Sequence, residues 1–104
     1  MTSTEAIEFI SSVLTHDKAV AKFTVTEVSP PDGETLKPPP IFMKIEGSHL
    51  GESAAATLLI HPKRQFDDDT KEYLRTTAAR AALMILDILE SKIKARIARA
   101  ARNN

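Results

Sequence analysis

The C-terminal third of the chain contains a long stretch without glycine or proline, and this stretch limits the folds open to the protein. It runs from Asp69 to about Ala101 and is rich in alanine, the best helix former. Acidic residues, Asp67 to Asp69, precede it, and lysine and arginine crowd its end, as the helix dipole favours. Glu72 follows Asp69 at the spacing of a capping pair. The sequence therefore predicts one helix of about 33 residues.

This helix is too long for a compact domain of 104 residues. At 1.5 Å per residue it measures about 50 Å, whereas such a domain is about 33 Å across. Its first half carries apolar residues on one side, which predicts packing against a core. These residues are Leu74, Ala78, Ala81, Ile85, Ile88 and Leu89. We therefore expect the second half to extend beyond the domain.

The pattern of the helix changes after Glu90. Beyond this point the side of the helix that faced the core carries the basic residues Lys92, Arg96 and Arg99. A neighbouring line of apolar residues continues to the end of the helix. This stripe consists of Leu86, Leu89, Ile93, Ile97 and Ala100. An apolar stripe on a projecting helix needs a partner, so we interpret it as the interface of a homo-oligomer, most simply a two-fold dimer. The alternative is that the last dozen or so residues fray.

The first two thirds of the chain predict one short helix and three strands. Apolar spacings of three and four indicate a helix over Thr4–Thr15, with Thr2 and Glu5 at the spacing of a capping box. Residues alternate between polar and apolar from Ala19 to Val28 and again over Ile41–Glu46, which predicts two strands. The third strand is expected over roughly residues 55–61. Its consecutive Leu58, Leu59 and Ile60 predict that both of its faces are covered.

Two segments have the composition of loops. Residues 29–40 hold five of the six prolines, and residues 47–53 hold two of the three glycines. We expect both to be exposed and more mobile than their flanking strands. The order α-β-β-β-α predicts a single α+β domain over residues 1–104, with a mainly antiparallel three-stranded sheet. Residues 1–66 would form the first helix and the sheet, and residues 67–104 the long helix with a basic tip.

The segment 47–53 also holds the residue types used in general-base chemistry. Ser48, His49 and Glu52 bring a hydroxyl, an imidazole and a carboxylate into one short segment, but they match neither a nucleophile elbow nor a phosphate loop. We treat them as a candidate ligand loop, with a plain hairpin connection favoured. His61 and the acidic cluster before the long helix suggest a metal site less well than they suggest helix capping. We predict no catalytic residues, no metal and no cofactor.

The basic tip allows a second interpretation. Residues 91–104 contain five basic and no acidic side chains on a chain whose formal net charge is +0. Lys92, Arg96 and Arg99 share one helix face and are candidate phosphate contacts of a DNA- or RNA-binding protein. Against this, the body is not basic, and we expect the five aromatic residues in the core rather than on a base-stacking surface.

The absence of cysteine favours a cytoplasmic protein, because it excludes disulfides and thiolate chemistry. The longest apolar run, Ala81–Leu86, is far shorter than a membrane span, and nothing suggests a signal peptide. The sequence therefore predicts a small non-enzymatic protein-binding module, an adaptor, assembly factor or inhibitor. We expect it to bind itself and another protein, with nucleic acid as the alternative partner.

Overall fold

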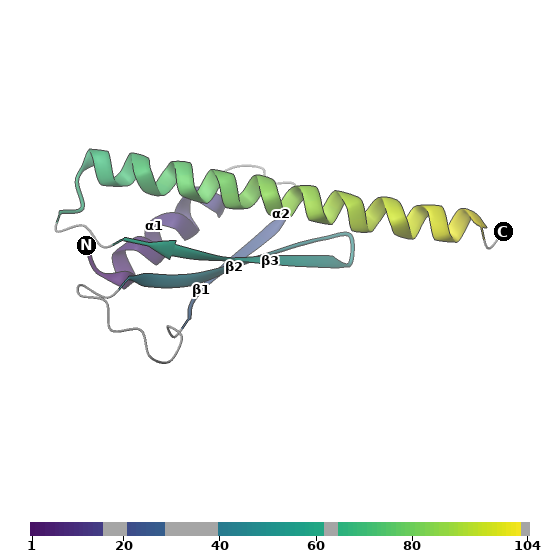
Figure 1. Cartoon of the computed structure of the whole chain (residues 1–104), viewed down its shortest axis with the longest axis horizontal. Helices are drawn as coiled ribbons and strands as arrows, with labels where there is room; N and C mark the ends of the chain where they lie inside the picture. Colours follow the sequence, from purple (N-terminus) through teal and green to yellow (C-terminus); the bar gives the residue numbers. More distant parts are fainter. Residues whose placement is uncertain (16–20, 29–39, 62–64, 103–104) are drawn as a thin grey trace.

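The computed structural model describes residues 1–15, 21–28, 40–61 and 65–102. It contains two helices and three strands in the predicted order (Figure 1): α1 (Ser3–Thr15), β1 (Lys22–Glu27), β2 (Ile41–His49), β3 (Glu52–Ile60) and α2 (Asp68–Arg102). This arrangement confirms the α+β prediction. The predicted loop at 29–40 falls almost entirely outside the described residues.

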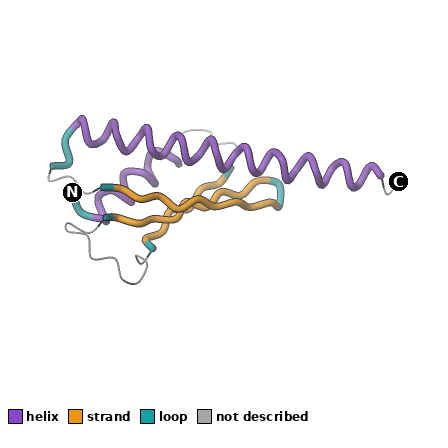
Figure 2. The backbone as a smooth tube through the Cα atoms, in the orientation of Figure 1, coloured by secondary structure: helices purple, strands orange, loops and turns teal. Residues whose placement is uncertain are grey.

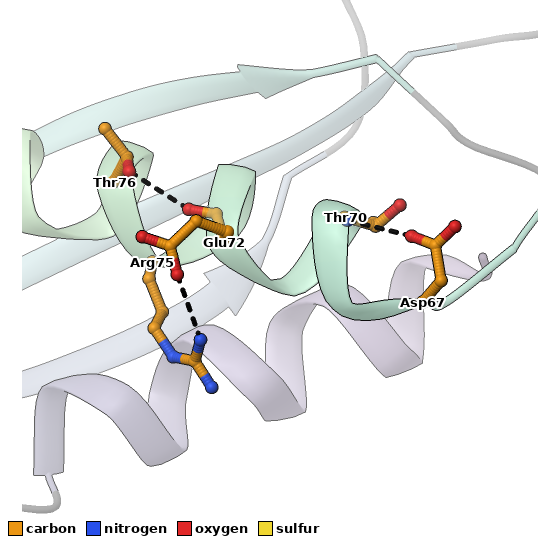
Figure 3. A network of polar contacts seen from close by, with 5 residues as sticks. All are labelled: Asp67, Thr70, Glu72, Arg75 and Thr76. Atoms are coloured by element: carbon orange, nitrogen blue, oxygen red, sulfur yellow. Dashed lines mark hydrogen bonds and ion pairs between the residues drawn. The ribbon is translucent and has the colours of Figure 1, made fainter.

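The helix starts follow from their caps. At α1 the predicted capping box is confirmed: the Glu5 amide donates to Thr2 Oγ1 at 3.1 Å and the Thr2 amide to Glu5 Oε1 at 2.9 Å. At α2 the predicted pairing of Asp69 with Glu72 is wrong. Asp67 caps the helix instead, because its Oδ1 accepts the amide of Thr70 at 2.9 Å (Figure 3).

The three strands form an antiparallel sheet in the order β1-β2-β3, with β2 in the centre. The predicted reversal within 47–53 is confirmed, but the loop is shorter than expected, because β2 continues to His49 and β3 begins at Glu52. The turn consists only of Leu50 and Gly51, both at positive φ, 50° and 82°. These values fit a type I′ turn, whose twist matches that of the strands it joins and so allows pairing to continue up to it.

Both helices cover the same face of the sheet, and the core lies between these two layers (Figure 2). In β2 the inward residues Ile41, Met43, Ile45 and Gly47 are all buried. Gly47 is required where α2 lies close to the strand, because a Cβ there would stand 2.7 Å from Ile85 Cγ2 and 3.0 Å from Phe23 Cε1. The fully buried residues of α2 against this layer include Leu74, Ala78 and Ile85.

No described element covers the other face of the sheet. Leu59 is 46% exposed there, so the expectation that β3 is covered on both faces is wrong. Phe42, expected in the core, lies opposite Leu59 on this outer face. Three consecutive apolar residues suggested a doubly covered strand, but a two-layer fold can bury only every second one. Separately, no helix in the described part of the chain is long and apolar enough to cross a membrane.

The molecule is elongated along α2. Its extents are 57 × 34 × 16 Å and its radius of gyration is 16.2 Å, larger than the roughly 13 Å of a compact chain of this length. The 35-residue α2 runs along the sheet and continues past the β2–β3 turn (Figure 1). The prediction that this helix outruns its domain is confirmed.

Candidate functional site

Exposed apolar side chains are concentrated on α2. Six large apolar residues are exposed in the described part of the chain, and four of them, Leu83, Met84, Ile88 and Ile97, lie on this helix. Leu83 is 67% exposed and Ile97 62%. Ile88 was expected in the core sector but is 39% exposed at its margin. Soluble proteins seldom leave several large apolar side chains exposed along one helix unless another molecule covers part of that surface.

The structure divides the predicted apolar stripe between the core and the surface. Leu89 is buried in the protein's own core, and Leu86 is partly buried against it. Ile93 is half-buried, whereas Ile97 and Ala100 are exposed. Only the distal part of the stripe is therefore fully available to a partner.

A hollow of about 450 Å³ lies beside this stripe, between α2 and the β2–β3 turn. We call it the turn groove. Its walls are mainly apolar, with polar groups at the rim, and it is lined by His49, Leu50, Leu86, Leu89, Glu90, Ile93 and Lys94. Leu50 is 62% exposed and has a φ of 50°, which non-glycine residues rarely adopt. A residue that exposes apolar surface and also strains the backbone points to a functional role at this groove.

Two of the three candidate phosphate contacts hold the hairpin against the helix. Lys92 Nζ donates to the Ser53 carbonyl at 2.6 Å, and Arg96 donates to the Leu50 carbonyl at 2.5 Å. Arg96 also lies 3.5 Å from a carboxylate oxygen of Glu52. The change of pattern after Glu90 thus has a local cause: the inward side of α2 here meets backbone carbonyls of the hairpin. Arg99 is exposed and makes no contact of this kind.

Lys94 interacts within its own helix. Its Nζ lies 2.8 Å from Glu90 Oε1. The hydrogen bond from Lys94 lowers the pKa of Glu90, and the same bond raises the pKa of Lys94. Both side chains are exposed at the rim of the turn groove, so the pair contributes little to stability.

The candidate ligand loop does not form a reactive cluster. Ser48 pairs with Ser53 on the outer side of the sheet, whereas His49 and Glu52 pair with each other on the side that faces α2. The hydroxyl and the imidazole are therefore on opposite faces. An open hollow of about 550 Å³ surrounds this end of the hairpin, but no side-chain hydrogen bond joins these three residues. In the described residues no group of three or more histidine, aspartate or glutamate side chains could hold a metal ion.

Sequence reasoning missed Leu50, Leu83 and Met84. Leu50 stands in a segment read only as a turn, and its exposure depends on how α2 passes the hairpin. Leu83 and Met84 belong to an apolar run whose other members face the core, so their own exposure was not evident. The available signal was that apolar residues at consecutive helix positions cannot all face one side.

Comparison of the chain with protein-family models, with curated proteins and with solved structures finds no significant match.

Proposed function

We propose that the protein is a cytoplasmic, non-enzymatic protein-binding module, an adaptor, assembly factor or inhibitor, that self-associates through α2. The observation that carries this proposal is the exposed apolar surface of α2, where four large side chains are at least 39% exposed. Burying such residues against a partner is favourable by roughly 25 cal/mol per Å² of apolar area.

The shape of the molecule supports the same proposal. The last turns of α2 extend beyond the sheet, and residues 97–102 there are all exposed. An isolated helix end gains little stability in water, because helices depend mainly on the packing of an apolar face. A partner alongside α2 would supply that packing.

Nucleic-acid binding is less well supported. Lys92 and Arg96 are engaged with the hairpin, so only Arg99 of the three candidate phosphate contacts projects without such a contact. A phosphate-binding surface needs several cations on one side, since each contact contributes separately to affinity and to its salt dependence.

Solution mass tests the proposal. Light scattering over a wide dilution series should give about twice the 11.4 kDa mass of one chain at high concentration, with dissociation on dilution. Raised salt should leave the complex largely intact, because apolar packing does not weaken as phosphate binding does. A single-chain mass at every concentration would overturn self-association.

A further inference from the structure

This inference rests on the proposed function and identifies the surface that a second copy covers. We propose that two copies pair through the free edge of β3 and the side of α2 above it, and form one continuous six-stranded sheet. The geometry favours this surface over the apolar stripe at Ile93 and Ile97 that the sequence suggested. The turn groove then stays open for another protein.

The edge of β3 presents unpaired backbone groups. β3 lies at the margin of the sheet, with β2 as its only strand neighbour among the described residues. The carbonyl of Phe42 accepts the amide of Val28 at 3.1 Å, so the backbone groups of Phe42 face β1. In the antiparallel ladder its partner Leu59 therefore directs its own amide and carbonyl away from β2, toward the free edge. By the same alternation, the amides and carbonyls of Ala55, Thr57 and Leu59 face outward.

This edge lacks the features that usually prevent pairing. Its outer residues Ala55, Thr57 and Leu59 are uncharged, and β3 contains no proline or lysine. Within the described part of the chain, only the end nearest the turn is occupied, because Lys92 donates to the Ser53 carbonyl. The next three outward residues therefore define the segment open to a second strand.

A two-fold axis through Thr57 pairs this segment with itself. Thr57 then faces the partner's Thr57, and Ala55 faces the partner's Leu59, so a small residue stands opposite a large one. No like charges meet in this register. The exposed Leu59 gains an apolar neighbour, and the paired residues all have free backbone groups.

The side of α2 above this edge is apolar as well. Leu86 and Ile93 line the turn groove on the side of His49, while Arg75 lies over the Phe9 ring of α1. At 100° per residue, Met84 and Ile88 lie on the opposite side of the helix, which is the side of β3. Met84 is 54% exposed. By this periodicity, the two residues lie on the side of α2 nearest the free edge.

The lengths of β3 and α2 are compatible with a single two-fold axis for both elements. From Ser53 to Thr57 the strand advances about 13 Å, which corresponds to about nine residues of helix. Counted back from Lys92, which contacts Ser53, this reaches Leu83, so Met84 lies within one residue of the level of Thr57. Met84 is also next to the midpoint of α2, which spans Asp68–Arg102. One axis through Thr57 and Met84 therefore brings two α2 helices together antiparallel with matched ends.

Distance and charge support the same arrangement. α2 contacts both β2 and β3, and strands are about 4.8 Å apart, so the two helix axes would be about 10 Å apart, a usual packing distance. The projecting basic end, with Arg99 and Arg102, would lie beside the partner's Asp67 to Asp69. Opposite charges at both ends favour the antiparallel orientation.

Single substitutions at the axis test the proposal. Thr57→Lys and Met84→Lys each place two like charges at the interface, so each should weaken the dimer by at least about tenfold. Thr24→Lys is the matched control, because Thr24 is exposed on the outer face of the other edge strand, β1. It should leave the dissociation constant unchanged. Circular dichroism and urea unfolding check that each variant folds, and Met84→Lys alters only an exposed helix position.

Cross-linking gives an independent readout. The chain has no cysteine, so Thr57→Cys introduces a single thiol. Directly opposed residues in an antiparallel pair have Cα atoms about 5.5 Å apart, within disulfide range. Oxidation should link most of the Thr57→Cys protein into dimers, and Thr24→Cys should stay largely monomeric.

The outcomes separate this inference from the proposed function. A dimer that resists Thr57→Lys and Met84→Lys but dissociates with Ile93→Asp/Ile97→Asp would overturn the β3 interface and leave self-association intact. Wild-type protein that stays monomeric would overturn both. Efficient cross-linking at Thr57, with Ile93→Asp/Ile97→Asp still dimeric, is the result we expect.

Discussion

Leu50 is unfavourable at its position both in backbone conformation and in the exposure of its side chain. It occupies the first position of a type I′ turn with a φ of 50°, where asparagine or glycine is usual, and its side chain is 62% exposed. Its carbonyl accepts a hydrogen bond from Arg96, which any residue at this position would preserve. The turn therefore does not require the leucine side chain, which lines the turn groove.

Replacing this side chain should make the protein more stable. Leu50→Asn should raise the free energy of unfolding by about 1 kcal/mol, because asparagine tolerates the left-handed conformation that leucine adopts at a cost. Gly51→Ala, at a φ of 82°, should lower it by a similar amount. Urea unfolding measures both changes. A Leu50→Asn protein of lower stability would contradict this account of the turn.

The hairpin and α2 form a connected pair of elements beyond the apolar core. The core of α2 ends at Leu89, and the contacts that follow are polar: Lys92 with Ser53, and Arg96 with Leu50 and Glu52. The Arg96–Glu52 ion pair is partly exposed and contributes little, whereas the bonds to backbone carbonyls fix the position of the turn.

We predict that these two side chains protect the hairpin turn. Lys92→Met/Arg96→Met keeps the helix propensity and an unbranched side chain but removes the donors, so the amides of Leu50, Gly51 and Glu52 should exchange faster with solvent. The control Lys94→Met/Arg99→Met removes the same two charge types but no hydrogen bond to the hairpin. Hydrogen exchange followed residue by residue makes the comparison. Equal amide exchange rates in the two variants would mean that the turn is stable without the hydrogen bonds from α2.

As a whole, the molecule is a thin two-layer body with a basic helix end. Its thickness is 16 Å against a length of 57 Å. Among the described residues, only one face of the sheet is covered, and both helices cover that face. Such a body exposes much surface for its size, which suits a protein that acts through contact with other molecules.

The basic end of α2 should bind nucleic acid weakly and without selectivity. At physiological salt we expect a dissociation constant for duplex DNA or RNA no tighter than about 10⁻⁶ M, because three of the five cations at this helix end, Lys92, Lys94 and Arg96, are engaged by protein groups. If Lys92, Arg96 and Arg99 do bind phosphates, replacing all three by glutamine flattens the salt slope by about three units. Fluorescence anisotropy in a salt series measures both quantities. A selective complex of sub-micromolar affinity would favour the nucleic-acid alternative.

Local patterns in the sequence were enough to predict the elements and their order. The glycine- and proline-free stretch predicted α2, alternation predicted β1 and β2, and the spacing of Thr2 and Glu5 predicted the cap of α1. These features depend on backbone conformation and on neighbours within a few residues, which is information that a single sequence contains. The excess length of α2 followed from its residue count alone.

The surfaces depended on contacts between residues far apart in the chain. Leu89 is buried and Met84 exposed because of where α2 crosses the sheet, and Leu59 is exposed because no described element covers the outer face. Lys92 and Arg96 contact residues more than thirty positions earlier in the chain. Periodicity defines the sides of a helix or strand, but burial is decided by the element that packs on each side, and that depends on the tertiary arrangement of the whole chain.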